Sequence, residues 1–206
     1  MTMKPMNLRI FLALLLLAAP AAHAQEQLGT EHVELTPFFG YRIGGHFRGG
    51  PADFPFEDAV SYGGLADINL TRDNFKLELL WSRQSTHLGR AFQGEPRKPL
   101  QIDHFQAGIL QEVGIERARL AVSALAGGSR FAAPGLGSET RFSGSIGGIG
   151  KVFATSHVGL RLDARLYGVY VKDVAGAFCG SGTCAFAYSG NMLWQSDFTA
   201  GLIIAF

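Results

Sequence analysis

The stretch Val158-Gly-Leu-Arg-Leu-Asp-Ala-Arg-Leu-Tyr-Gly-Val-Tyr170 alternates apolar and polar side chains with a period of two residues. In an extended strand, this period sends successive side chains to opposite faces. One face would carry Val158, Leu160, Leu162, Ala164, Leu166 and Tyr170, and the other Arg161, Asp163, Arg165 and Tyr167. The stretch therefore predicts a β-strand with one apolar face and one charged face.

The same alternation recurs along the chain from residue 33 onward. We expect seven further strands, at about 33–47, 60–71, 75–86, 102–113, 118–124, 141–152 and 192–206. Two positions disturb the pattern. Leu110 falls among polar residues, and Pro37 lacks the N–H that a strand interior needs, so we expect a bulge or a later strand start there.

The lengths of the connections also alternate. They are short after the second, fourth and sixth strands and long after the others, at 48–58, 87–100, 132–139 and 174–189. Short turns would therefore gather at one end of an eight-stranded, all-β, antiparallel up-and-down barrel, and long loops at the other. Transmembrane barrels of the bacterial outer membrane are built in this way.

The composition excludes several classes of protein. The chain has 206 residues, of which 47% are hydrophobic and 17% charged, too apolar for a disordered segment. Its formal net charge is only +1, which argues against nucleic acid as a partner. Glycine is frequent, with 27 residues, and glycine weakens ordinary strands and helices. A special arrangement must therefore accommodate it.

Residues 1–24 have the pattern of a secretory signal peptide. Lys4 and Arg9 precede an uncharged run, which ends in the small-x-small triplet Ala22-His23-Ala24. We expect cleavage after Ala24, leaving a single barrel domain over 25–206. Sixteen bases would then face seventeen acids.

A soluble, lipocalin-like ligand-binding barrel also has eight alternating strands, but with its apolar face inward. Three features favour the membrane orientation. The expected strands are longer than the usual five or six residues, and the polar face is rich in Gly, Ser and Ala, as a narrow lumen requires. Aromatic residues mark both ends of the apolar face, as interfacial girdles do: Tyr62, Phe142, Tyr170 and Trp194 near the loops, Phe75 and Phe206 near the turns.

The closing stretch Phe198-Thr-Ala-Gly-Leu-Ile-Ile-Ala-Phe206 resembles the C-terminal recognition signal of outer-membrane barrels, with Phe198, Leu202, Ile204 and Phe206 on one face. From residue 33 onward the chain is similar to the small outer-membrane proteins of the OmpA transmembrane domain and OmpX type. This resemblance implies assembly by the outer-membrane insertion machinery and a location among outer-membrane lipid and lipopolysaccharide. It brings no cofactor and no catalytic motif.

The polar face would fill the lumen, because an eight-stranded barrel is just wide enough for its own side chains. Buried charges have to be paired, and a register counted from the closing seam puts Asp197 near Arg42. A gated proton or ion path is the functional alternative to a structural plug. The expected lumen charges are Glu34, Asp67, Glu78, Glu112, Asp163 and Asp197 with Arg42, Lys76, Arg119, Arg141, Lys151, Arg161 and Arg165.

Cys179 and Cys184 lie in the last long loop. Two thiols are too few for a zinc site, so in an exported protein we expect a small disulfide, with a redox-active pair as the alternative.

Enzymatic activity would need a nucleophile, a base and an orienting group. The candidates for a lipid A-modifying site are Ser85, His87 and His46 near the loop end, whereas Ser156-His157 falls in a turn at the other end. The sequence shows no complete set of nucleophile, base and orienting group, so we expect no catalytic site. We also expect no metal site. The loops at 51–56 and 177–188 carry aromatics that suit contact with a host or partner surface.

Overall fold

The structure is a computed structural model that describes residues 32–49, 52–55, 57–70, 74–87, 99–115, 117–134, 137–170, 175–180, 183–188 and 192–206. The expected signal peptide lies outside these residues. Within them, no helix is long and apolar enough to cross a membrane.

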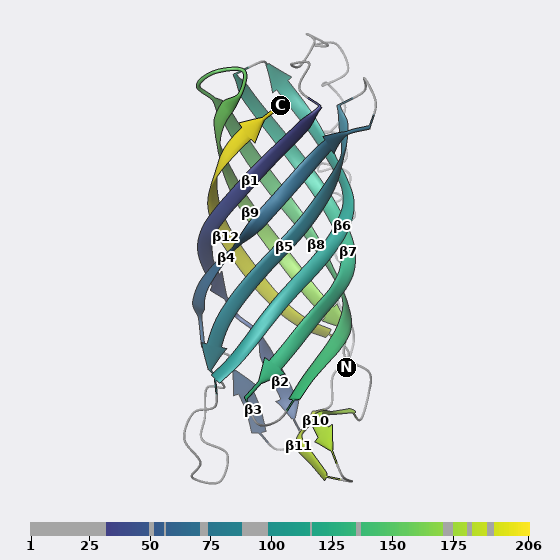
Figure 1. Ribbon diagram of the computed structural model, residues 1–206. Coiled ribbons are helices and arrows are strands. Elements are labelled where there is room, and N and C mark those ends of the chain that lie inside the picture. Colours follow the sequence, from purple (N-terminus) through teal and green to yellow (C-terminus); the bar gives the residue numbers. More distant parts are fainter. Residues whose placement is uncertain are drawn as a thin grey trace, which may run out of the picture.

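Eight antiparallel strands form a closed barrel, which confirms the expected fold class (Figure 1). Each strand pairs with its neighbour along the chain, and the first and last strands close the seam. The strands are β1 (Val33–Ile43), β4 (Ala59–Asn69), β5 (Phe75–His87), β6 (Pro99–Ile115), β7 (Ala118–Ala133), β8 (Gly137–Phe153), β9 (Val158–Tyr170) and β12 (Met192–Ala205).

Two small hairpins in the long connections complete the described structure. They are β2 (His46–Gly49) with β3 (Ala52–Pro55), and β10 (Ala175–Gly180) with β11 (Thr183–Tyr188). Both lie at the barrel end opposite the C-terminus (Figure 1). We call this end the loop end and the other the turn end. The alternation pattern did not predict these hairpins.

The first strand differs from the expectation at two points. It ends at Ile43 rather than near residue 47, because Gly44 and Gly45 adopt φ angles of 79° and 101°, a region that L side chains rarely enter. The expected bulge or late start at Pro37 is wrong. Pro37 pairs with Gly64 of β4, and the register with β12 is the same on both sides of it, from Leu35↔Ile204 to Phe38↔Gly201.

The expectation of a long loop at 132–139 is also wrong. Strands β7 and β8 continue to pair up to Ala133↔Gly137. Alternation persists through this hairpin, with Phe131 buried and Arg130 exposed. Only three residues therefore separate the last paired positions of the two strands.

The alternating side chains separate as the pattern predicted. Apolar side chains on the outer face are strongly exposed around the whole barrel, for example Leu162 at 56% and Leu120 at 66%, while charged side chains fill the interior. Leu110, which broke the pattern in β6, points inward and packs with Ala121 and Ile149.

The inward face contains glycine, as the polar pattern predicted, but glycine also lies on the outer face. Gly108 faces inward, where an added Cβ would collide with the backbone of β7. Gly148 faces outward into open space. Glycine therefore permits close strand packing inside the barrel and leaves hollows on its outer face.

Candidate functional site

Ten charged side chains form a single network in the turn-end half of the lumen, which we call the charge network. Each of them is at most 6% exposed. Five acids balance five bases, so the charge network is neutral. Its members are Glu34, Asp67, Glu78, Glu112 and Asp163 with Lys76, Arg119, Lys151, Arg161 and Arg165.

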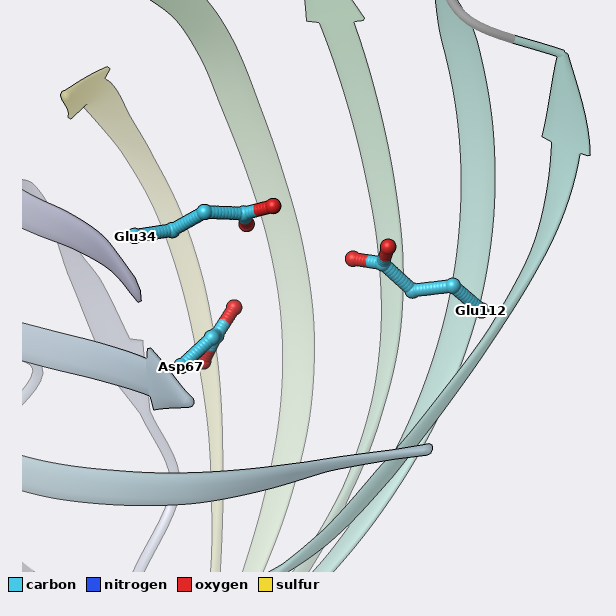
Figure 2. Close-up of side chains that lie close together, drawn as sticks. All are labelled: Glu34, Asp67 and Glu112. Carbon is cyan, nitrogen blue, oxygen red and sulfur yellow. The ribbon is translucent and has the colours of Figure 1, made fainter. Parts of the chain in front are cut away.

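Lys151 is the centre of one part of the charge network. Its Nζ donates to Glu34 Oε2 at 2.6 Å, to Asp67 Oδ2 at 2.8 Å and to Glu112 Oε1. Figure 2 shows these three carboxylates projecting from different strands toward a shared space inside the barrel. One oxygen of each lies within 4.8 Å of the others, a spacing that could hold a metal ion. The ammonium of Lys151 supplies the cation for this trio.

Two arginines continue the charge network along β9. Arg161 donates to Asp67 at 2.8 Å, Glu78 at 2.5 Å and Asp163 at 2.9 Å. Arg165 donates to Glu78 at 2.8 Å and Asp163 at 3.0 Å. Because most of these carboxylates accept from two bases, the removal of one base leaves more than one buried acid undercompensated.

Arg42 and Asp197 form a separate pair nearer the loop end. They are register partners across the closing seam, and the Arg42 Nε and Nη2 atoms donate to Asp197 Oδ2 at 3.1 and 2.5 Å. Ser61 donates to the other carboxylate oxygen at 2.7 Å, and Arg42 Nη2 also donates to Ser82 at 2.6 Å. The guanidinium lies 4.5 Å from the Tyr167 ring centroid.

An apolar cluster lies between the Arg42–Asp197 pair and the charge network, where β1, β4 and β5 contribute Phe38, Leu65 and Leu80. Phe38, Leu65, Leu80 and Leu125 pack with Tyr167. On the β6 and β8 side, a chain of hydrogen bonds runs from Arg165 through Ser145 to Gln106 and Ser143. Side chains therefore fill the lumen at this level, with an apolar packing on one side and a satisfied polar chain on the other.

Arg141 lies apart from the charge network, at the loop end of β8. It pairs with Glu139, and the two side chains are 23% and 31% exposed. Glu139 faces inward too, although the sequence pattern did not mark it, because the expected strand began only at residue 141. With Glu139, the inward charges of the eight strands number seven acids and seven bases.

The expected catalytic candidates do not form a site. Ser85 and His87 share the outer face of β5, but residues two apart on a strand are separated by about 7 Å, and the Ser85 hydroxyl has no partner among the described residues. His87 Nδ1 lies 3.8 Å from Glu57. Of His46, only the backbone is described, in β2. Ser156 contacts His157 at 2.8 Å in the turn, where no described carboxylate contacts the imidazole.

A buried Ser–His contact was missed by the sequence reasoning. His104 Nδ1 lies 2.6 Å from Ser129 Oγ, and its ring stacks on Tyr167 at 4.4 Å between centroids. The two residues are register partners on β6 and β7, so a correct register would have revealed them. Both are fully buried, and neither contacts a carboxylate in the described structure. The pair lacks both an orienting group and access for a substrate.

Cys179 and Cys184 are backbone partners across the β10–β11 hairpin. The structure does not describe their side chains, so the disulfide remains a prediction. The four residues of the expected assembly signal, Phe198, Leu202, Ile204 and Phe206, all lie on the outer face.

Comparisons with known proteins relate the fold to solved barrels. No family model and no curated protein matches the chain. Among solved structures, Neisserial surface protein A matches with a TM-score of 0.57 at 9% identity, covering 84% of this chain and 97% of that one. Because the sequence identity is so low, this match supports a likeness of fold alone.

Two weaker matches have TM-scores below 0.5. Ail, the attachment invasion locus protein of Yersinia pestis, was solved with a heparin analogue and matches at 0.47 with 11% identity, over 84% of this chain and 99% of that one. The outer membrane protease OmpT of Escherichia coli matches at 0.45 with 10% identity, over 89% and 99%. The match to Neisserial surface protein A, whose TM-score exceeds 0.5, shows that the chain has the fold of a small outer-membrane barrel.

Proposed function

We propose that this chain is an integral protein of the bacterial outer membrane, with a lumen closed by its own side chains and a surface-contact role at its loop end. The distribution of charge carries the proposal. On the eight strands, fourteen charged side chains face the lumen and three face outward. An apolar outer surface of this extent requires a lipid solvent, and a soluble lipocalin-like barrel would have the opposite distribution.

The surface role rests on the loop end. The long connections at this end include the β2–β3 and β10–β11 hairpins, and the sequence there contains Phe54, Phe56, Phe178, Phe186 and Tyr188. Aromatic residues on exposed loops suit contact with a host or partner surface. The partners at the barrel wall are outer-membrane lipid and lipopolysaccharide.

Export and assembly complete the proposal. The segment 1–24 would direct export and be cleaved after Ala24. The outer-membrane insertion machinery would then recognise the face formed by Phe198, Leu202, Ile204 and Phe206. We propose no enzymatic activity, because no described set of side chains supplies a nucleophile, a base and an orienting group within reach.

Cell fractionation combined with electrophoresis tests the membrane location. We expect the protein in the outer-membrane fraction, released by detergent and not by salt, with a mobility before heating that differs from its mobility after boiling. Folded membrane barrels resist the detergent of the gel, since their hydrogen bonds close on themselves. Recovery in the soluble periplasmic fraction would contradict the proposal.

The closed lumen leads to a prediction about conductance. Purified protein in a planar bilayer should give no steady ionic current, because paired charges and the apolar cluster leave no continuous water path. The quadruple variant that changes Phe38, Leu65, Leu80 and Leu125 to serine is expected to raise leak current without changing the strand content seen by circular dichroism. Stable single-channel steps in the parent protein would overturn the prediction.

The cysteine pair leads to a prediction about the loop end. The exported protein should have an intact mass lower by two hydrogens than the same protein after reduction, and Cys179 should resist alkylation until reduced. The bond closes a very short ring, so its effect on global stability is about 2 kcal/mol at most. Free thiols in exported protein would exclude the disulfide.

A further inference from the structure

All three charges on the outer face of the eight strands lie together. Arg83 on β5, Asp103 on β6 and Arg130 on β7 are consecutive register partners. We call them the outer charged row. The outward side chains described on β1, β4, β8, β9 and β12 are uncharged. One sector of the wall therefore differs from the rest of the barrel.

The outer charged row has a net positive charge. Arg83 donates to Asp103 through Nε at 2.6 Å and Nη2 at 3.3 Å, and its guanidinium lies 5.6 Å from the Trp81 ring centroid. Asp103 also accepts from Gln101 at 2.8 Å. Arg130 is exposed, and among the described residues its side chain donates to Ser138 alone, at 3.2 Å. Arg130 therefore presents most of its donors to the surroundings.

An apolar groove of about 560 Å³ lies on the same strands, and its lining includes Trp81, Phe105, Ala107 and Ala126. Trp81 and Phe105 are two residues from Arg83 and Asp103 on the turn-end side, and Ala107 and Ala126 are four residues from Asp103 and Arg130. The small side chains of Ala107 and Ala126 leave the groove deep, and Trp81 and Phe105 line the end of the groove nearest the outer charged row.

We propose that this sector binds a phosphate-bearing, multiply acylated lipid of the outer leaflet, with an acyl chain in the groove and a phosphate at Arg130 and Arg83. The inference deepens the proposed membrane role and rests on it. The loop end faces outward in that role, so a lipid of the outer leaflet has its headgroup at the level of the outer charged row and its chains alongside the groove. Arginine donors match phosphate oxygens.

The charge arrangement suits an anionic headgroup. The Asp103 carboxylate is held by Arg83 and is 4% exposed on its side chain, so it presents little negative charge to a phosphate. Uncharged outer-leaflet lipids would leave the Arg130 guanidinium without a counterion at the membrane interface. A phosphate would supply that counterion where solvent is sparse.

Binding can be measured with the full barrel folded into phosphatidylcholine vesicles that contain either bis-phosphorylated lipid A or its dephosphorylated form. Bound lipid is quantified by native mass spectrometry after mild extraction. We expect the phosphorylated form to be retained about tenfold more than the dephosphorylated form. The variant R130Q should lose most of this preference, whereas R117Q, which removes an exposed base at the turn end, should keep it.

The groove is tested separately. The variant A126L, whose larger side chain would fill part of the groove, should weaken retention of phosphorylated lipid A. The variant A200L, on the outer face of β12, should not. Inorganic phosphate should not compete at concentrations equal to the lipid, because it cannot occupy the groove. Equal retention of the two lipid forms, or an unchanged preference in R130Q, would overturn the lipid site while leaving the membrane location intact. Failure of the parent barrel to insert would instead contradict the proposed function.

Discussion

Replacement of Lys151 by methionine is expected to lower the free energy of unfolding by about 3–5 kcal/mol, the range for removal of one partner from a buried ionic group. The reason is local. The Lys151 ammonium contacts Glu34, Asp67 and Glu112, and these carboxylates have little access to water. Lys76 and Arg119 still contact Glu34 and Glu112, and Arg161 still contacts Asp67, but each carboxylate of the trio loses one of its cations. Urea unfolding of the barrel in lipid vesicles measures the loss.

Two further variants separate charge from packing. The conservative change K151R keeps a cation in the lumen and should cost less than K151M. The double variant K151M/E112Q removes one negative charge together with the cation, so it should recover part of the loss, as coupled neighbours do. A change below about 1 kcal/mol in K151M would show that the charge network contributes little to stability.

Replacement of Leu162 by arginine is expected to destabilise the barrel by about 2–4 kcal/mol, the cost of a cation on a barrel wall near the middle of a bilayer. Leu162 is 56% exposed on the outer face of β9, near the centre of that strand. Leu70 is 55% exposed on the same face but beside a turn. The matched variant L70R should cost only about 0–1 kcal/mol, because the side chain reaches the interface.

The same urea titration measures both variants, provided that the vesicles are identical. Comparison of L162R with L70R cancels the intrinsic difference between leucine and arginine, and what remains is the depth dependence. Equal effects of the two substitutions would indicate an outer face in water. Stabilisation by L162R, as at a water-exposed apolar site, would indicate the same.

The sequence predicts the barrel well because alternation is a local property. The charged face of one strand is already evident from Arg161, Asp163 and Arg165 in the sequence. The register counted from the closing seam also places Asp197 opposite Arg42. The failures at β7 and β8 have a common cause. The strand at 118–124 was cut short where glycines interrupt the apolar pattern, so the β7–β8 pairing and Glu139 were missed.

The interior of the barrel is less predictable, because its contacts depend on side chains that cross the lumen. Lys151 on β8 contacts Glu34 on β1 and Asp67 on β4, and neither of these strands pairs with β8. The register between neighbouring strands does not predict such contacts. His104 and Ser129 needed an exact register between β6 and β7. The outer charged row needed the same register, since Arg83, Asp103 and Arg130 are unremarkable one at a time.

The most direct test of the membrane orientation is a scan of single cysteines along β9, from residue 159 to residue 166, in a background where Cys179 and Cys184 are serine. Each cysteine carries a fluorophore, and quenching by lipids with a quencher on the acyl chain is recorded in vesicles. We predict strong quenching at 160, 162 and 164 and weak quenching at 159, 161 and 163. Weak quenching at 160, 162 and 164, or no alternation along the strand, would contradict a barrel whose apolar face lies in lipid.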